Sequence, residues 1–377
     1  MAQEIELKLS FNPHYLGSLL QQPLFHLPET EAQGERELSN HYFDTADQAL
    51  QRERVALRIR RIGERYIQTL KTRGQSAAGL HQRNEWEWEL ERPELDFARL
   101  AEADWPEALA GLDSSGIQPA FSTDFSRRLW RYRSRNADGK AVDIELALDR
   151  GEAWLEQDGE RRSDPICELE LELKQGQPAD LFAVALELAH HVPLQICDIS
   201  KAERGYRLHA PAQYRPPLER SKPTGELTLE QVYCQLLQQE LQAWPRLLEA
   251  WQFSRQWQYV EQALASLLNV SALRARFSDL APLKADDPLS PLLDKLIGRL
   301  QPLLDWQRCR ELLGPAGTDW SAHQQEKAHQ GVELLNQTLE PGLCALLLGQ
   351  ALQQRSWRQY WQPQHRERAN QRLDQAE

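Results

Sequence analysis

The chain has 377 residues, of which 41% are hydrophobic and 27% are charged, and its formal net charge at pH 7 is −12. This length allows two domains with buried cores, and the composition is ordinary for a soluble globular protein. The negative charge excludes a general nucleic-acid binder, which needs a basic surface, but it leaves room for a local cationic pocket.

The first predicted strand is the stretch MAQEIELKLS at residues 1–10, in which Glu4, Glu6 and Lys8 alternate with aliphatic residues. Because successive side chains of a strand point to opposite faces, the three charged residues share one face. Taken alone, such a strand favours a charged face in water. The later strands decide whether this interpretation holds.

The pattern from about residue 37 to residue 174 has a period of two and predicts many strands. The predicted strands are 37–44, 54–61, 65–72, 83–91, 127–135, 141–149, 152–157 and 165–174. Short Gly-containing turns such as Asp138-Gly139 separate several of them and are typical of hairpins. Antiparallel strands at this spacing predict a barrel or a sandwich. Short helices are expected at 12–20, 180–190 and 200–208.

The composition changes at residues 211–223, where four prolines and no apolar period predict a linker. Beyond it the apolar period becomes helical, and Thr228 and Gln231 predict a capping box. Further helices are expected after Asp287-Pro288 and at 251–268, 321–339 and 343–361. The sequence therefore predicts a β domain at 1–210, a linker at 211–223 and an all-α domain at 224–377.

Charged residues recur at alternate positions along most of the predicted strands. They include Arg58, Arg60, Lys71, Arg83, Glu85, Arg127, Glu145, Asp149, Glu168, Glu170 and Glu172. In an ordinary barrel these charges would face water, whereas in an inverted barrel they would line a tunnel with the apolar faces packed outward. Basic and acidic residues fall in blocks on different strands, which favours the tunnel.

Such a tunnel suits polyphosphate chemistry. Guanidinium and ammonium groups match phosphate oxygens in charge and geometry. Clustered carboxylates bind Mg²⁺ or Mn²⁺, and the metal bridges phosphate oxygens in turn. Both kinds of residue in one barrel predict a metal–phosphate complex as the ligand.

A series of motifs resembles the CYTH family, the triphosphate tunnel metalloenzymes. It runs in order through ExExK at 4–8, YFDT at 42–45, LRIR at 57–60, TLK at 69–71, and the segments 79–85, 121–127, 145–152, 167–173 and 200–206. The helical half makes the chain similar to the inorganic triphosphatases in which a CYTH domain precedes a CHAD helical domain. The resemblance implies an α+β protein with an eight-stranded antiparallel β-barrel tunnel, flanking helices and a C-terminal helical bundle.

The resemblance also implies roles for individual residues. The residues implied to bind the triphosphate are Arg58, Arg60, Lys71, Arg83, Arg127, Lys201 and Arg204. Glu4, Glu6, Glu170 and Glu172 would hold Mg²⁺, or Mn²⁺ in its place, and Lys8 would orient or deprotonate the attacking water. Glu85, Glu145, Asp149 and Glu168 would be further acidic lining. Which two of Glu168, Glu170 and Glu172 bind metal stays open, because all three share a face.

The resemblance implies hydrolysis of inorganic triphosphate to pyrophosphate and phosphate. Two alternatives stay open: an adenylate cyclase or another nucleoside or thiamine triphosphate enzyme, and a polyphosphate-binding scaffold with an inactive barrel. The helical half fits the CHAD pattern less well. CHAD domains carry histidines and basic residues that bind polyphosphate, and the histidines of this half are only His323, His329 and His365. We therefore expect that half to serve packing or contact with a protein partner, with polyphosphate binding as the alternative.

The five cysteines are widely spaced and form no CxxC pair, which indicates reduced thiols. The first residues lack the basic and apolar regions of a signal peptide. No apolar run approaches the ~20 residues of a membrane span. We therefore expect a cytoplasmic protein that binds neither membranes nor nucleic acid.

Overall fold

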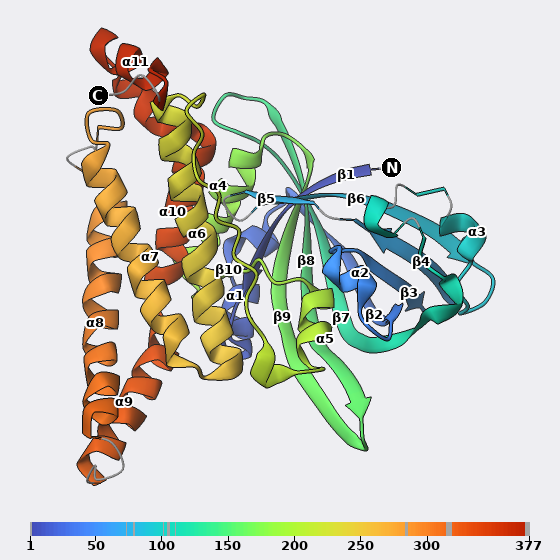
Figure 1. Ribbon diagram of the computed structural model, residues 1–377. Coiled ribbons are helices and arrows are strands. Elements are labelled where there is room, and N and C mark those ends of the chain that lie inside the picture. Colours follow the sequence, from blue (N-terminus) through green and yellow to red (C-terminus); the bar gives the residue numbers. More distant parts are fainter. Residues whose placement is uncertain are drawn as a thin grey trace.

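The computed structural model describes residues 2–373 apart from 73, 78–79, 101, 104–105, 110, 283–285 and 314–318. A β-barrel and a bundle of long helices stand side by side (Figure 1). The bundle follows the barrel in the sequence, as the change of periodicity predicts.

The barrel is a closed antiparallel sheet. Of the ten strands in the described part of the chain, eight form a ring and two short strands add to its edge. In ring order the strands are β1 (Ala2–Ser10), β9 (Glu160–Gln175), β8 (Ala141–Gln157), β7 (Ile117–Arg135), β2 (Thr30–Thr45), β3 (Ala56–Ile62), β4 (Arg65–Lys71) and β6 (Leu80–Leu90). Pairing of β1 with β6 closes the ring, while β5 (Gln75–Ala77) pairs with β6 and β10 (Gln195–Ile196) with β1. The predicted eight-stranded barrel is confirmed.

Several strands are longer than predicted. The expected strands 141–149 and 152–157 are one strand, β8, which passes through Gly151. A Cβ atom there would overlap the backbone of Asp124 and Phe125, so glycine allows β7 to lie close. Strand β2 begins before the prediction, at Thr30. Its first half is mostly exposed and therefore lacks the apolar alternation that marks a strand.

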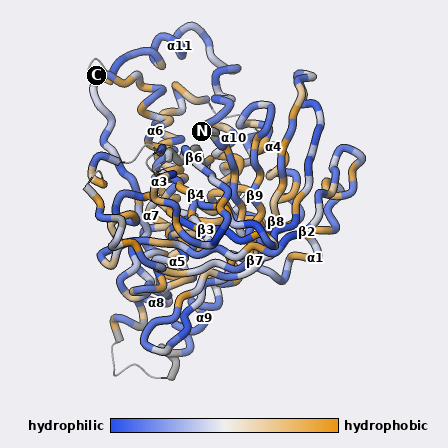
Figure 2. Tube along the Cα trace, turned by 90° about the vertical axis from the view of Figure 1, so that its right-hand side faces the viewer, coloured by the Kyte–Doolittle hydropathy of each residue, from blue (hydrophilic) through white to orange (hydrophobic). Residues whose placement is uncertain are grey.

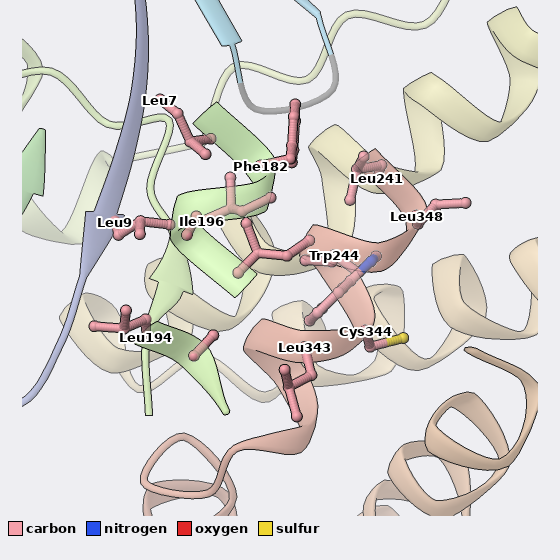
Figure 3. Packing of buried hydrophobic residues seen from close by; sticks show 14 of the residues in the cluster. Leu7, Leu9, Phe182, Leu194, Ile196, Leu241, Trp244, Leu343, Cys344 and Leu348 are labelled. Atoms are coloured by element: carbon pink, nitrogen blue, oxygen red, sulfur yellow. The ribbon is translucent and has the colours of Figure 1, made fainter. Parts of the chain in front are cut away.

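The apolar faces of the strands point outward. Leu7 and Leu9 of β1 are fully buried, and Figure 3 shows Leu7 pointing toward Phe182 of α4 (Pro178–Ala189) and Leu9 beside Ile196 of β10. Trp244 of the helical bundle belongs to the same core. The barrel therefore shares its outer core with the helices, and its charged faces are left for the interior.

The helical region consists of helices that pack on one another, and one of them, α10 (Glu340–Gln354), packs on α4 and β10. They are α6 (Leu229–Ser254), α7 (Trp257–Arg276), α8 (Leu289–Leu313), α9 (Asp319–Leu335), α10 (Glu340–Gln354) and α11 (Pro363–Asn370). Shorter helices flank the barrel: α1 (Leu16–Leu20), α2 (Ala49–Arg52), α3 (Phe97–Leu100) and α5 (Lys201–Arg207). The polar helix α11 is hydrophilic over most of its length (Figure 2). No described helix is long and apolar enough to cross a membrane.

Two predicted features of these helices have different outcomes. The capping box of Thr228 and Gln231 is present at the start of α6. The single helix expected at 251–268 is wrong, because α6 ends at Ser254 and Arg255 has a left-handed φ of 58° before α7 begins. Such a residue reverses the chain direction and lets α6 and α7 pack as neighbours.

Candidate active site

The charged faces of the strands enclose a cavity of about 280 Å³ inside the barrel. Its charged lining residues are Glu4, Glu6, Lys8, Arg58, Arg60, Lys71, Glu85, Glu87, Arg127, Glu145, Glu170, Glu172, Lys174 and Lys201. The interpretation of the barrel as inverted, with charges inside, agrees with this lining. We call this space the tunnel cavity.

Carboxylates of three adjacent strands lie in register on one side of the tunnel cavity. Glu6 of β1 is paired with Glu172 of β9, which is paired with Glu145 of β8. Like charges directly opposite one another on a sheet repel. Lys174 contacts Glu172 and Arg131 lies 3.8 Å from Glu145, so these two carboxylates are partly neutralised, and a divalent cation would relieve the repulsion that remains.

Glu4 shows the same crowding at the end of β1. Burial, helped by the carboxylates of Glu85 and Glu172 and opposed by Lys71, raises the pKa of Glu4 to about 7. The Lys71 ammonium lies 3.6 Å from Glu4 and 2.8 Å from Glu85. Burial opposes ionisation of Glu85, but Lys71 and Arg58 outweigh it and lower the pKa of Glu85 to about 2. One ammonium thus serves two carboxylates.

Cations crowd together on β3. The side chain of Arg58 is buried, lies 3.8 Å from Glu85 and donates to the Tyr42 hydroxyl at 3.3 Å. Its Nε is buried and has no hydrogen-bond partner among the described residues. Burial, together with Arg58 and Arg127, lowers the pKa of Arg60 to about 9. Buried guanidinium groups that are incompletely paired form a site for an anion.

A buried network fixes the far wall of the tunnel cavity. The Lys201 ammonium contacts Asp149 at 2.7 Å, Glu170 at 2.9 Å and also Glu168. Arg127 donates to Asp149 at 2.7 and 2.6 Å and to Glu170 at 2.6 Å. Asp149 and Glu168 are fully buried and do not line the cavity. They hold the cations in place instead of presenting free acidic groups.

The oxygens of Asp149, Glu168 and Glu170 lie within 4.8 Å of one another, which is close enough for a shared metal ion. Lys201 and Arg127 already neutralise this group, however. Lys8 is also nearby and donates to the Ile199 carbonyl at 3.1 Å. Burial opposes its charge, but the carboxylates of Glu168, Glu6 and Glu170 outweigh burial and raise the pKa of Lys8.

The short helix α5 places Lys201 in this network. The hydroxyl of Ser200 accepts a hydrogen bond from the Glu203 amide and caps the helix, so Lys201 occupies its first turn. Gly205 packs on the ring of Phe121, which a Cβ atom would overlap. The sequence SKAERGY thus combines a cap, a cation and a close contact with β7.

The structure separates Arg204 from the other predicted phosphate ligands. It lies three residues after Lys201, and its guanidinium contacts Asp164 at 3.4 Å and Glu249 of α6 at 3.7 Å. It is buried and absent from the tunnel lining. Arg83 lies on β6 opposite Glu4, but its side chain is outside the described residues.

Three charged or aromatic residues of the tunnel lining are absent from the predicted site residues: Tyr42, Glu87 and Lys174. Glu87 is in phase with Glu85, and Lys174 is in phase with Glu172, so the alternation could have found both. Tyr42 stands within the YFDT motif, but an aromatic residue beside Phe43 looks like core. The arrangement as a whole can hold a polyanion on its basic side and a divalent cation on its acidic side.

Comparisons with known proteins agree with the geometry. A family model described as CYTH domain matches residues 2–206. An inorganic triphosphatase from Haemophilus influenzae is 36% identical over 208 residues, which are 55% of this chain and 55% of that protein. The chain thus spans about half the length of this curated relative.

Solved structures also resemble the barrel. A candidate adenylyl cyclase from Hippeastrum, described as having a dominant triphosphatase activity, is 19% identical with a TM-score of 0.38, and the match covers 54% of this chain and 95% of that one. A candidate adenylate cyclase from Bacillus halodurans is 23% identical with a TM-score of 0.31, covering 50% and 90%. Because the family model matches more than half of the sequence, the chain belongs to the CYTH domain family.

Proposed function

We propose that the chain hydrolyses inorganic triphosphate to pyrophosphate and phosphate within the tunnel cavity, with Mg²⁺ as the metal. One observation carries the proposal. Incompletely paired cations on β3 line the same cavity as the carboxylates that lie in register on β1, β9 and β8. A site of this kind suits a polyanion bound together with a divalent cation. The inorganic triphosphatase from Haemophilus influenzae supports the choice of substrate.

The carboxylates of Glu4, Glu6 and Glu172 would hold the metal. Glu145 joins them because it lies beside Glu172 in the register. Glu170 is a weaker candidate than its place in the motif suggests, because Lys201 and Arg127 already engage its carboxylate. When bound, Mg²⁺ would neutralise phosphate oxygens and bind the attacking water.

The basic residues would bind and orient the triphosphate. Arg58, Arg60 and Lys71 face the cavity from the wall formed by β3 and β4, and Arg127 and Lys201 face it from the wall formed by β7 and α5. Holding three phosphates between these walls aligns the terminal phosphorus for in-line attack. The water oxygen then bonds to that phosphorus as the bridging P–O bond breaks, and the released pyrophosphate stays paired with the cations. Lys8 would orient the water from β1.

The test is phosphate release from inorganic triphosphate by the full chain, with Mg²⁺, with Mn²⁺ and with a chelator, beside ATP and thiamine triphosphate. We expect hydrolysis that stops on chelation. Glu6→Gln should lower kcat by about 100-fold or more, since it removes a charge that holds the metal. Arg58→Ala should lower kcat/KM mainly through weaker binding of the phosphates.

The matched control is Arg65→Ala, because Arg65 is an arginine on the adjoining strand β4 whose side chain is 66% exposed. Its activity should equal that of the unmodified chain. Absence of turnover of all three triphosphates with either metal contradicts the proposal. Formation of cyclic AMP from ATP without phosphate release would favour the adenylate cyclase alternative.

A further inference from the structure

A second cavity of about 650 Å³ lies where the barrel meets the helical region, and we call it the junction cavity. Its walls come from α2, α5, the segment at 209–220 and α6. Figure 1 shows this segment passing along α6 between the two parts of the molecule. Pockets that bind small ligands span roughly 300–1,000 Å³, so the volume suits one.

The junction cavity adjoins the tunnel cavity. Ala56, Lys71, Ser200 and Ala202 line both of them. The Lys71 ammonium, which contacts Glu85 at 2.8 Å, therefore stands at their common boundary. A ligand that lies in the junction cavity can present an anionic group to Lys71 and to the tunnel beyond it.

One part of the junction cavity is apolar and aromatic. Val55, Tyr206, Tyr214 and Leu218 contribute to it, and Tyr206 and Tyr214 are held by hydrogen bonds of their hydroxyls to Asp44 and Glu203. Gln213 and Gln239 add amide groups. A fully inorganic ligand would leave the apolar wall uncovered, whereas an organic group would bury it.

The remaining wall is mainly cationic, although Asp198, Glu203 and Glu219 also line the cavity. Arg52, Arg54 and Arg220 line it with side chains that are 58%, 46% and 49% exposed, and each pairs with one acidic residue. The pairs of Arg52 with Asp47 and of Arg54 with Glu219 are exposed on both sides and exchange partners at little cost, whereas the Glu240 partner of Arg220 is buried. Arg215 donates to the Ala212 and Tyr214 carbonyls, and no carboxylate of the described chain lies within ion-pair distance of it. The wall thus offers positive charge to an anion.

The geometry points to the junction cavity as a binding site for an amphipathic organic phosphate. Its organic end packs on Tyr206, Tyr214 and Leu218, and its phosphate end reaches Lys71 at the tunnel mouth. An ester of triphosphate would extend into the tunnel cavity as a substrate, whereas an ester of monophosphate would block the mouth. This assignment rests on the proposed triphosphatase function, because it takes the tunnel mouth as the substrate's path.

The experiment uses the full chain and adenosine, AMP and ATP as probes. Calorimetry measures binding of each probe, and phosphate release measures inhibition of triphosphate hydrolysis by AMP. Ala210→Trp fills the junction cavity, and its control is Ala212→Trp, at an exposed position two residues on that does not line it. Arg215→Ala removes the guanidinium of the cavity wall that has no carboxylate partner among the described residues. Its control is Arg92→Ala, at a side chain that is 76% exposed.

We expect AMP to compete with inorganic triphosphate and adenosine to bind at least about tenfold more weakly than AMP. Ala210→Trp and Arg215→Ala should each raise the Kd for AMP by about tenfold while changing the KM for inorganic triphosphate by less than about twofold. Both control variants should bind AMP as the unmodified chain does.

Two results overturn the assignment. One is an equal effect of Ala210→Trp on the Kd for AMP and on the KM for inorganic triphosphate, which would mean that AMP binds in the tunnel cavity. The other is the absence of AMP binding altogether. If inorganic triphosphate is not hydrolysed at all, the proposed function fails. Calorimetry with AMP then still shows whether the junction cavity binds an organic phosphate.

Discussion

Glu249 of α6 and Arg207 of α5 form a two-pronged ion pair, with Nη1–Oε2 and Nη2–Oε1 distances of 3.0 and 2.8 Å. Arg207 also donates from Nε to Asp164 of β9 at 2.8 Å. One guanidinium therefore connects the helical region, α5 and the barrel. Because α5 also carries Lys201, this ion pair links the helical region to a wall of the tunnel cavity.

Glu249→Gln should destabilise the protein and disturb the position of α5. We expect a loss of about 2 kcal/mol in the free energy of unfolding, since Arg207 keeps Asp164 as a partner. Chemical denaturation measures this loss, and Glu187→Gln, at an exposed position of α4, is the control. A raised KM for triphosphate under conditions where the variant is fully folded would show that α5 positions Lys201; an unchanged KM would show that it does not.

Lys201→Met should remove a proposed phosphate ligand and leave Asp149 and Glu168 buried with fewer partners. We expect the free energy of unfolding to fall by about 3 kcal/mol. We also expect the activity to fall by about 100-fold. Adding Glu168→Gln should recover part of the stability, because it removes one of the uncompensated charges, but no activity. If the two substitutions are additive in stability, the contact between Lys201 and Glu168 contributes nothing.

Gly205→Ala should be destabilising, because its methyl group would overlap the ring of Phe121. We expect a loss of roughly 1–3 kcal/mol in the free energy of unfolding, which thermal or chemical denaturation measures. Gly17→Ala in α1 is the matched control, since no heavy atom would lie within 4 Å of its Cβ. That control should be neutral or slightly stabilising. Equal effects of the two substitutions would contradict the close contact between α5 and β7.

Glu340 should make the stability of the helical region depend on acid. Burial opposes its charge, but hydrogen bonds from Lys295 and Thr338 outweigh burial and lower the pKa of Glu340 to about 2 from its usual 4.5. A carboxyl group whose pKa is lowered by folding stabilises the folded state above its unfolded pKa. That contribution disappears as the pH falls from about 4.5 through about 2.

Glu340→Gln should therefore lower the free energy of unfolding by at most roughly 3 kcal/mol at pH 7 and have no effect near pH 2. Urea denaturation between these pH values measures the difference from the unmodified chain. Glu326→Gln, at an exposed position of α9, should show no such pH dependence. A constant difference between pH 7 and pH 2 would rule out Glu340 as the source.

The alternation of charged and apolar residues was enough to predict the barrel and most of the tunnel lining. The period of two assigns a face to each residue, but it cannot rank Glu168, Glu170 and Glu172, which share a face. Their different environments depend on Lys201, which arrives from a helix about thirty residues later. Sequence periodicity carries no information about that long-range contact.

Arg204 shows the complementary difficulty. On α5 it lies three residues from Lys201, yet its partners are Asp164 and Glu249, and Glu249 belongs to a helix on the far side of the linker. The motif SKAERGY groups both cations, and only the packing of α6 distinguishes them. The start of β2 escaped prediction for a different reason, because an exposed strand has no apolar face to reveal it.

Because Leu7, Leu9 and their neighbours point outward, the stability of the barrel depends on the helices that cover them. A sheet whose interior is filled with charges cannot gain stability by closing on itself, so its hydrophobic stabilisation must come from outside. Gly342 of α10 sits so close to the Leu194 carbonyl that even a methyl group would not fit between them. The helical region therefore completes the hydrophobic core on the outside of the barrel. A fragment of residues 1–210 would expose these apolar side chains to water, and we expect it to aggregate.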